Sequence, residues 1–342
     1  MMQISPEIQL FIREHSSDDV RVLALQAKKY PDIDMPTVIT QIAGRKVAAE
    51  KIPSWWEIEK IWYPKHLSLE QCSSEITARY KARLLQGDSL TDLTGGFGID
   101  CSFLATGFKS ATYVERQEEL CEIAAHNFPV LNLNHINIKN EDGVTYLQAM
   151  SPVDCLFLDP ARRNEHGGKT VAISDCEPNV AELEELLLQK ANRVMIKLSP
   201  MLDLSLALKE LKQTQEVHIL SVNNECKELL ILLGQTSPAE ISIHCVNLFT
   251  KGTQKEQHFV FTREQEQCSE CTYTDSLETY LYEPNASLLK AGAFRSIAAA
   301  YPVRKLHPNS HLYTSDSTSW ERLVISWRLV SSVCRTVESL LS

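Results

Sequence analysis

Apolar residues recur at helical spacing through residues 1–70. The segments 5–15, 18–30 and 35–52 carry them three or four positions apart, and the first opens with Ser-Pro-Glu, a sequence typical of a helix start. The aromatic-rich stretch 55–63 follows and predicts a packing patch rather than a ligand-binding surface. Residues 1–70 are therefore expected to form a helical N-terminal domain.

Short apolar runs alternate with helical stretches from residue 75 to residue 199. Because parallel strands need helical crossovers, this alternation predicts a parallel β-sheet covered by helices on both faces. Ligands bind such sheets beyond the carboxyl ends of the strands, so the residues that follow each strand are the first candidates for a site. The predicted strands are 89–95, 110–115, 135–142, 153–159 and 193–199, and the predicted helices are 75–85, 99–107, 118–128, 143–150 and 179–191.

The rest of the chain predicts strands first and helices afterwards. Residues 215–234 contain two apolar strands joined at Asn223-Asn224-Glu225, and so short a link predicts an antiparallel hairpin that closes the sheet. Strands are also expected at 239–249 and 256–263. Helices are expected at 285–301 and 319–341.

The composition is that of a soluble globular protein, with 342 residues of which 44% are hydrophobic and 23% charged. There is no run of about 18 apolar residues that would span a membrane. Residues 1–20 lack the basic and apolar regions of a signal peptide, so a cytoplasmic location is expected, and no obligate protein partner is evident. The net charge of −10 argues against indiscriminate nucleic-acid binding.

The ten cysteines are expected to be free thiols, several of them within apolar, strand-like surroundings. Cys268 and Cys271 form the only C-x-x-C pair. A closed zinc site needs four ligands and no second pair lies nearby, so no metal site is expected.

A glycine-rich turn follows the first predicted strand, in the sequence Asp92-Leu-Thr94-Gly95-Gly96-Phe-Gly98-Ile-Asp100. Glycines let the backbone approach a ligand closely, and a helix N-terminus follows them. The glycines do not match the dinucleotide-binding pattern Gly-x-Gly-x-x-Gly, because Cys101 occupies the sixth position counted from Gly96. The Gly-Lys-Ser/Thr sequence of a P-loop is also absent. An acid before the glycines suits a ligand with an ammonium group better than a pyrophosphate.

Three further acids fall at the ends of the next three strands. Glu115 ends the second strand, from which a carboxylate can accept hydrogen bonds from both ribose hydroxyls. Asp142 follows the third strand and can accept one from an adenine amino group, and Asp159 ends the fourth. A ligand that joins an amino acid, a ribose and an adenine is S-adenosyl-L-methionine.

With these motifs, residues 71–235 resemble a class I S-adenosylmethionine-dependent methyltransferase. The resemblance implies an α/β, Rossmann-like sheet of seven strands with an antiparallel hairpin at one edge. It also implies a methyltransferase domain, whose boundaries we predict at residues 71 and 237. It also implies a helix at 71–85 that lies against the methionine end of the cofactor. The cofactor-binding residues that it implies are Asp92, Thr94, Gly95, Gly96, Gly98, Asp100, Glu115, Asp142 and Asp159.

The whole chain is similar to a group of bacterial methyltransferases that carry small α+β C-terminal domains. That resemblance implies a ferredoxin-like segment at 238–276 and a THUMP-like domain at 277–342, the latter on the phrases LYEPNASLLKAGAF and HLYTSD. THUMP domains bind RNA, although they usually precede the catalytic domain. RNA, either tRNA or rRNA, is therefore the expected partner.

The fourth strand ends in Asp159-Pro-Ala-Arg162-Arg163, where related enzymes carry an Asp/Asn-Pro-Pro-aromatic turn. An arginine stacks on a base and pairs with phosphate or carboxylate, so the substrate is expected to carry an anion near the reacting atom. Arg162 and Arg163 are the candidate substrate-binding residues, and the alternative is that they hold an acidic loop. Asp159, Arg162, Lys197 and Ser199 are the candidate catalytic residues, with Lys197 as a base or as the partner of a neighbouring acid.

The same turn resembles the DPPR stretch of 5-methyluridine RNA methyltransferases, which need a cysteine nucleophile after the fifth strand. In this chain Ser199 stands before Pro200 at that place, which argues against methylation of pyrimidine C5 by that route. Three functions remain open: an RNA methyltransferase, a methyltransferase of a small carboxylate metabolite or a protein, and a non-catalytic RNA-binding protein of the same fold.

Overall fold

The computed structural model describes residues 5–162, 172–236, 238–316 and 324–328. The chain divides into two compact units. The first consists of residues 1–159 with 185–194, and the second of residues 160–184 with 195–342.

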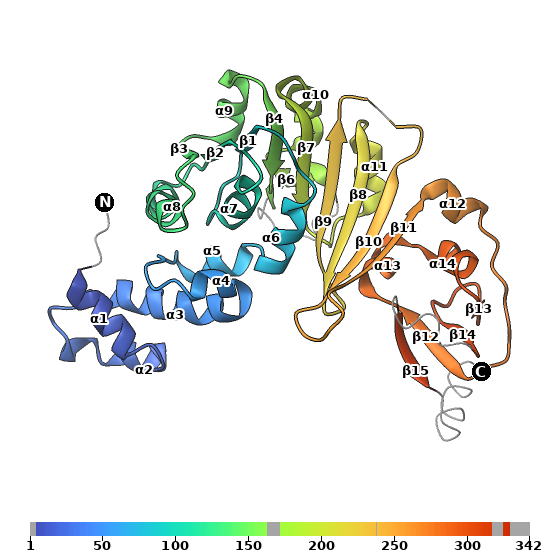
Figure 1. Cartoon of the computed structure of the whole chain (residues 1–342), viewed down its shortest axis with the longest axis horizontal. Helices are drawn as coiled ribbons and strands as arrows, with labels where there is room; N and C mark the ends of the chain where they lie inside the picture. The colour runs from blue at the N-terminus through green and yellow to red at the C-terminus, as the bar shows by residue number, and fades with distance from the viewer. Residues whose placement is uncertain (1–4, 163–171, 237, 317–323, 329–342) are drawn as a thin grey trace. The chain divides into compact units, whose positions relative to one another are not determined.

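The first unit begins with the predicted helices. Helices α1 (Pro6–Glu14), α2 (Val20–Leu25) and α3 (Met35–Lys51) confirm the helical spacing of residues 5–52 (Figure 1). Ser5 caps α1, because its hydroxyl accepts a hydrogen bond from the backbone N–H of Ile8 at 3.3 Å. Their apolar faces meet in a cluster that includes Leu23, Met35, Val38 and Ile42. Three shorter helices complete this region: η1 (Ala27–Lys29), α4 (Pro53–Trp56) and α5 (His66–Gln71).

The aromatic stretch packs as predicted. Trp55 is 2% exposed and meets Phe97 edge to face, with ring centroids 5.2 Å apart. Phe97 belongs to the glycine-rich turn, so this contact fixes the helical region to the turn within the first unit.

The parallel strands of the first unit are also as predicted. Strand β1 pairs in parallel with both β2 and β4, and β2 with β3. The carboxyl ends of these strands therefore lie at one edge. The strands are β1 (Ser89–Asp92), β2 (Ser110–Val114), β3 (Ile136–Lys139) and β4 (Val153–Leu158), and the helices are α6 (Glu75–Ala82), α7 (Ile99–Ala105), α8 (Glu118–Val130), α9 (Gly143–Ala149) and α10 (Val180–Lys190).

The complete sheet has nine strands, in the order β11-β10-β8-β9-β7-β4-β1-β2-β3. The Rossmann-like α/β class is confirmed, and the seven strands expected of residues 71–237 are present in the order β8-β9-β7-β4-β1-β2-β3. Two additional strands extend the sheet, because β10 pairs in parallel with β8 and β11 pairs antiparallel with β10. These two strands come from the segment 238–276. The added elements are β7 (Ala191–Leu198), β8 (Thr214–Val222), β9 (Glu225–Gly234), β10 (Ser242–Leu248) and β11 (Glu256–Thr262).

The predicted hairpin forms between β8 and β9. Asn223 and Asn224 take left-handed φ values of 48° and 66°, the conformation of a two-residue turn whose twist matches the strands. The hairpin does not close the sheet, because β10 continues it beyond β8.

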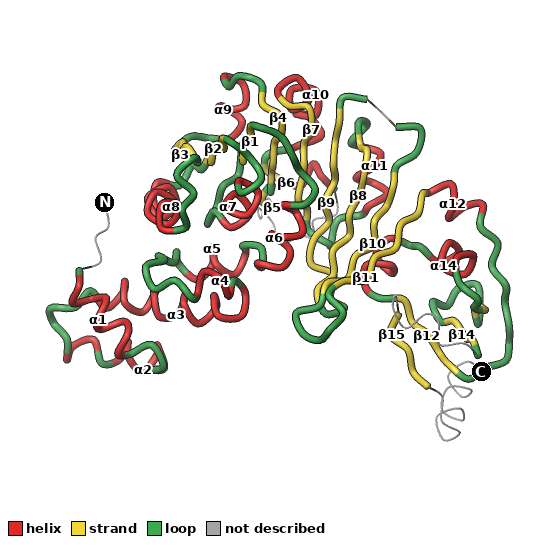
Figure 2. The backbone as a smooth tube through the Cα atoms, viewed as in Figure 1, coloured by secondary structure: helices red, strands yellow, loops and turns green. Residues whose placement is uncertain are grey.

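The C-terminal part of the second unit contains a four-stranded sheet of order β13-β14-β12-β15, and Figure 2 shows its strands β12, β14 and β15 in yellow. The predicted helical stretch at 285–301 is confirmed as two helices, α13 (Ala286–Ala291) and α14 (Phe294–Ala300), which are separated at Gly292 with a φ of 73°. The helix predicted over 319–341 is wrong at Val324–Arg328, which forms β15 and pairs antiparallel with β12. This stretch contains valine, isoleucine and tryptophan, which favour strands once a partner strand is available.

The other helices and strands of the second unit are short. They are β5 (Ala161–Arg162), η2 (Ile173–Asp175), β6 (Cys176–Glu177), α11 (Leu204–Glu210), α12 (Arg263–Cys268), β12 (Tyr280–Pro284), α13 (Ala286–Ala291), α14 (Phe294–Ala300), β13 (Arg304–Lys305) and β14 (Tyr313–Ser315). Among the described residues, no helix combines the length and the apolar character needed to cross a membrane.

A glycine-rich turn and its carboxylates as the candidate site

The glycine-rich turn is held by its own backbone and by the first acid. The N–H of Thr94 donates to Oδ1 of Asp92 at 2.9 Å, and the N–H of Gly98 donates to the carbonyl of Gly95 at 2.9 Å. The N–H of Gly95 donates to the carbonyl of Val114 at the end of β2, at 2.8 Å. The turn is therefore fixed to two neighbouring strand ends.

Two of its glycines have no substitute at their positions. A Cβ at Gly95 would lie 2.2 Å from the ring of Tyr113, a side chain that is fully buried and so cannot move aside. Gly98 has a φ of 86°, which side chains rarely tolerate. The Tyr113 hydroxyl also donates to the carbonyl of Gly96, so this ring both packs on the turn and holds its backbone. The sequence alone did not single out Tyr113.

Asp92 is the most unusual group of the turn. It is 1% exposed, and among the residues that the structure describes no group hydrogen-bonds its Oδ2. Burial first, and then the nearby carboxylates of Asp100, Asp159 and Glu115, raise its pKa to about 8, although the hydrogen bond from Thr94 acts in the opposite direction. A buried carboxyl among other acids is costly unless a cation joins it.

Asp100 lies at the other end of the turn in very different surroundings. Its carboxylate pairs with the ammonium group of Lys81 at 2.8 Å and accepts a hydrogen bond from the Ser73 hydroxyl at 2.7 Å. The ammonium group of Lys81, itself fully buried, also donates to Ser73 at 2.7 Å. This network joins α6 to α7. Lys81 lies in the helical segment that was predicted to face the methionine end of the cofactor, but the ion pair between Lys81 and Asp100 was not predicted.

Glu115 is brought over the glycines by the parallel register of β1 and β2. Its Oε2 accepts from the N–H of Gly96 at 2.9 Å, and its Oε1 accepts from the N–H of Gln117 at 2.8 Å. The side chain of Asn140 donates to the backbone carbonyl of Glu115 at 2.9 Å and so ties the end of β3 to the end of β2. Because each carboxylate oxygen has two lone pairs, Glu115 keeps capacity for further donors.

The last two acids are held in different ways. Asp142 is exposed and caps α9, since its Oδ1 accepts from the N–H groups of Val144 and Thr145 at 3.1 and 3.0 Å. The backbone N–H of Asp159 donates to the Thr94 hydroxyl at 2.6 Å, which anchors the start of the Asp-Pro turn to the glycine-rich turn.

The candidates for handling the acceptor belong to the second unit. Arg162 ends the short strand β5, which pairs with β6, and Arg163 lies outside the described residues. Lys197 is 8% exposed near the end of β7. The hydroxyl of Ser199 accepts from the N–H of Met201 at 3.3 Å.

The geometry of the first unit fits the cofactor that the sequence predicts. A buried oxygen without a partner, surrounded by acids, is complementary to an ammonium group, and glycines leave the adjacent backbone open to a bulky ligand. The fold and this site together define a methyltransferase-like protein of the α/β class.

Comparison with solved structures agrees with that class. A candidate methyltransferase from Porphyromonas gingivalis W83 superposes with a TM-score of 0.82 at 33% sequence identity, and the match covers 99% of this chain and 87% of that one. The chain belongs to the same methyltransferase family as this Porphyromonas protein.

More distant structures share much less. A candidate modification subunit of a type I restriction enzyme from Vibrio vulnificus YJ016 matches with a TM-score of 0.40 at 12% identity, over 59% of this chain and 56% of that one. A candidate methyltransferase from Streptococcus mutans, solved in complex with S-adenosylhomocysteine (SAH), matches with a TM-score of 0.34 at 14% identity, over 47% of this chain and 96% of that one.

Comparisons at the level of sequence give one result. A family model described as a ferredoxin-like domain matches residues 280–320, which lie within the segment where the sequence analysis expected the THUMP-like domain. No curated protein matches the chain.

Proposed function

We propose that the protein transfers a methyl group from S-adenosylmethionine to RNA, and that it does so without a cysteine nucleophile. The observation that carries the cofactor half of this proposal is the buried Oδ2 of Asp92 beside the glycine-rich turn, which has no hydrogen-bond partner in the part of the chain that the structure describes. S-adenosylmethionine supplies, when bound, a methyl group activated by a sulfonium centre.

The chain's own groups have separate tasks in this proposal. Asp92 accepts a hydrogen bond from the ammonium group of the cofactor, and Glu115 accepts hydrogen bonds from the ribose hydroxyls while the N–H groups of Gly96 and Gln117 keep its carboxylate in place. Thr94 fixes the backbone at Asp159, where the Asp-Pro turn begins. Asp142 remains the candidate for the adenine amino group.

A mechanism without a thiolate nucleophile fits six of the cysteines that the structure describes. Burial raises the pKa of the thiols of Cys101, Cys121, Cys155, Cys226, Cys245 and Cys271, so none of these six is a thiolate at neutral pH. Cys268, the exposed one, ends α12 and lies far along the chain from the strand ends.

The RNA half of the proposal rests on the arginines at 162–163 in the sequence, which suit an acceptor that carries phosphate. Arg162, Lys197 and Ser199 are the residues to which we assign the acceptor. A small carboxylate metabolite or a protein is the second candidate, and the net charge of −10 favours it.

The test is to label an extract. The purified full chain is incubated with methyl-labelled S-adenosylmethionine and an extract of a strain that lacks the gene, and the RNA, protein and dialysable fractions are counted. We expect label in RNA that nuclease releases, that Asp92→Asn abolishes, and that Arg162→Ala reduces while its cofactor affinity is unchanged.

Other outcomes contradict separate parts of the proposal. Label confined to the protein or dialysable fraction would reject RNA and keep the methyltransferase. The absence of both label and cofactor binding at millimolar concentration would reject the enzyme and leave a non-catalytic protein of this fold.

A further inference from the structure

Three histidines of the second unit lie on neighbouring strands of the sheet. His218 is on β8, His244 on β10 and His258 on β11. His218 and His244 are direct partners in the parallel register of β8 and β10, and His258 pairs with Val246, two positions along from His244. Because side chains alternate between the faces of a strand, this register places all three histidines on one face, together with Glu216.

A second set of contacts shows, independently of the strand register, on which face of the sheet the histidines lie. The side chain of Gln257 accepts hydrogen bonds from Asn285, at the start of α13, and from Asn247, at 3.2 and 3.1 Å. Gln257 is one position from His258, and Asn247 is three positions from His244, so both are separated from these histidines by an odd number of residues. The histidines therefore occupy the face opposite to the one that contacts α13.

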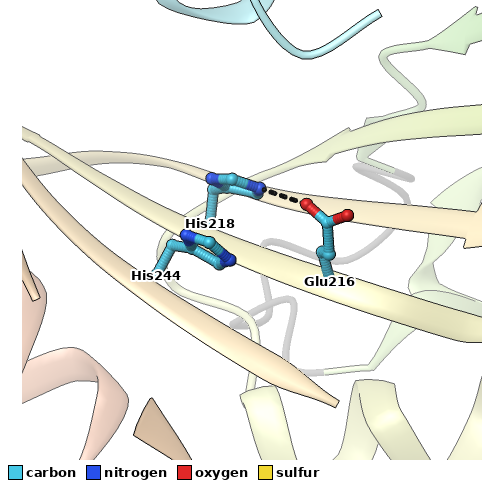
Figure 3. Close-up of side chains that lie close together, drawn as sticks. All are labelled: Glu216, His218 and His244. Carbon is cyan, nitrogen blue, oxygen red and sulfur yellow. Dashed lines mark hydrogen bonds and ion pairs between the residues drawn. The ribbon is translucent and has the colours of Figure 1, made fainter. Parts of the chain in front are cut away.

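The side chains of this face form a tight cluster (Figure 3). Nε2 of His218 lies 3.3 Å from Oε2 of Glu216, and the rings of His218 and His244 stack with centroids 4.3 Å apart and an angle of 18° between their planes. One ligand atom from each of Glu216, His218 and His244 lies within 4.8 Å of the others. His218 is 2% exposed, while Glu216 and His244 are partly exposed.

We propose that Glu216, His218 and His244 bind a divalent transition-metal ion, zinc in the first instance. Two imidazoles and one carboxylate are a known ligand set for zinc, with bonds of about 2.0–2.2 Å. In a tetrahedral site such bonds place the ligand atoms about 3.4 Å apart, close to the separation between His218 and Glu216. The ligand atoms, now within 4.8 Å of one another, would have to move closer around the ion, and water would complete the coordination.

His258 is the outer partner of this site. Its Nε2 lies 3.1 Å from Nδ1 of His244, so Nδ1–H of His244 can donate to His258 and leave Nε2 with its lone pair for the metal. Nε2 of His244 now lies 3.2 Å from the hydroxyl of Ser242, a contact that the ion would replace.

The ligand set selects among cations. Imidazole suits zinc, copper, nickel and iron, whereas magnesium and calcium prefer all-oxygen ligands. Because the ligands come from β8 and β10, a bound ion would cross-link these two strands, and the hydrogen bond between His244 and His258 would connect β11 to the site. The proposal concerns the second unit alone and does not depend on the methyltransferase assignment.

The experiment is a calorimetric titration of the purified full chain, after dialysis against a chelator, with Zn²⁺ alone and separately with Mg²⁺. We expect saturable binding of one Zn²⁺ per chain and none of Mg²⁺. His244→Gln should weaken zinc binding by about 100-fold or more, and His258→Gln by about 10-fold, as expected of an outer partner. Glu216→Gln, which removes another partly exposed ligand, should weaken zinc binding in the same way and replaces His244→Gln if that variant does not fold.

Two control variants separate this site from others on the chain. His307→Gln removes an exposed histidine of the same unit, and Cys268→Ser with Cys271→Ser removes the C-x-x-C pair; both should bind zinc as the unaltered chain does. The proposal is overturned if the unaltered chain takes up no stoichiometric zinc. It is also overturned if the cysteine variant loses the ion, or if His244→Gln and Glu216→Gln both retain full affinity.

Discussion

The two ends of the glycine-rich turn bury an acid each, and the two acids have opposite surroundings. Asp100 has the ammonium group of Lys81 at 2.8 Å and the hydroxyl of Ser73 at 2.7 Å. Asp92 is more deeply buried, faces three carboxylates, and keeps one oxygen without a partner among the described residues. One acid has its cation built into the fold, and the other is arranged for a cation that the fold does not supply.

That difference separates a structural role from a binding role. A buried charge that is already paired contributes to stability only while its partner remains, whereas an unpaired one costs stability until a ligand pairs with it. The sequence motif contains both acids, eight residues apart, and nothing in the motif distinguishes them. The predictions below test whether the two acids differ as their surroundings indicate.

The largest effect is expected from Lys81→Met. Removing the ammonium group leaves the Asp100 carboxylate buried without this partner, which costs about 3–5 kcal/mol in the free energy of unfolding. Urea unfolding followed by circular dichroism measures it. Adding Asp100→Asn to Lys81→Met should recover much of the loss, because the uncompensated charge is then gone. If the double variant were no more stable than Lys81→Met, the uncompensated charge of Asp100 would not be the cause of the lost stability.

A smaller effect, in binding rather than in stability, is expected from Asp92→Asn. Loss of the charged partner of an ammonium group typically costs about 2 kcal/mol or more, which is about 30-fold in affinity for S-adenosylhomocysteine. Asp100→Asn is the matched control, since it removes a charge of the same turn that already has a partner. Calorimetry should show nearly unchanged affinity for the folded Asp100→Asn protein. Equal losses in the two variants would remove the distinction between the two acids.

Much of the first unit was predictable, because its pattern is local. In a parallel sheet the carboxyl ends of strands meet at one edge, so Asp92, Glu115 and Asp159 could be expected close together from their positions after apolar runs. What the sequence does not encode locally is pairing. The partner of Asp100 lies nineteen positions earlier, in another helix, and no spacing rule connects Lys81 with it.

The histidine cluster illustrates the same limit more strongly. His218, His244 and His258 each stand inside a stretch correctly predicted as a strand, yet their meeting depends on which strands are neighbours and in which register. The hairpin was expected to close the sheet, which would have left β8 without β10 beside it. Likewise the helix expected over 319–341 failed at β15, because pairing with β12 decides the structure of Val324–Arg328.

The last prediction concerns the pH dependence of stability at Asp92, with a change that is small for each pH unit. Its pKa is about 8 in the folded protein against 3.8 for an ordinary aspartate, so between these values the folded state holds a proton that the unfolded state has released. The free energy of unfolding therefore falls as pH rises from about 4 to about 8, by at most about 1.4 kcal/mol per pH unit from this group.

The variant that isolates this contribution is again Asp92→Asn, which cannot titrate. The difference in unfolding free energy between Asp92→Asn and the unaltered chain should grow in favour of the variant as pH rises to about 8, and it should level off above that value. If the difference in unfolding free energy for Asp92→Asn did not change with pH, the Asp92 carboxyl would be ionised at neutral pH beside another cation. The turn would then not need a cation from a ligand.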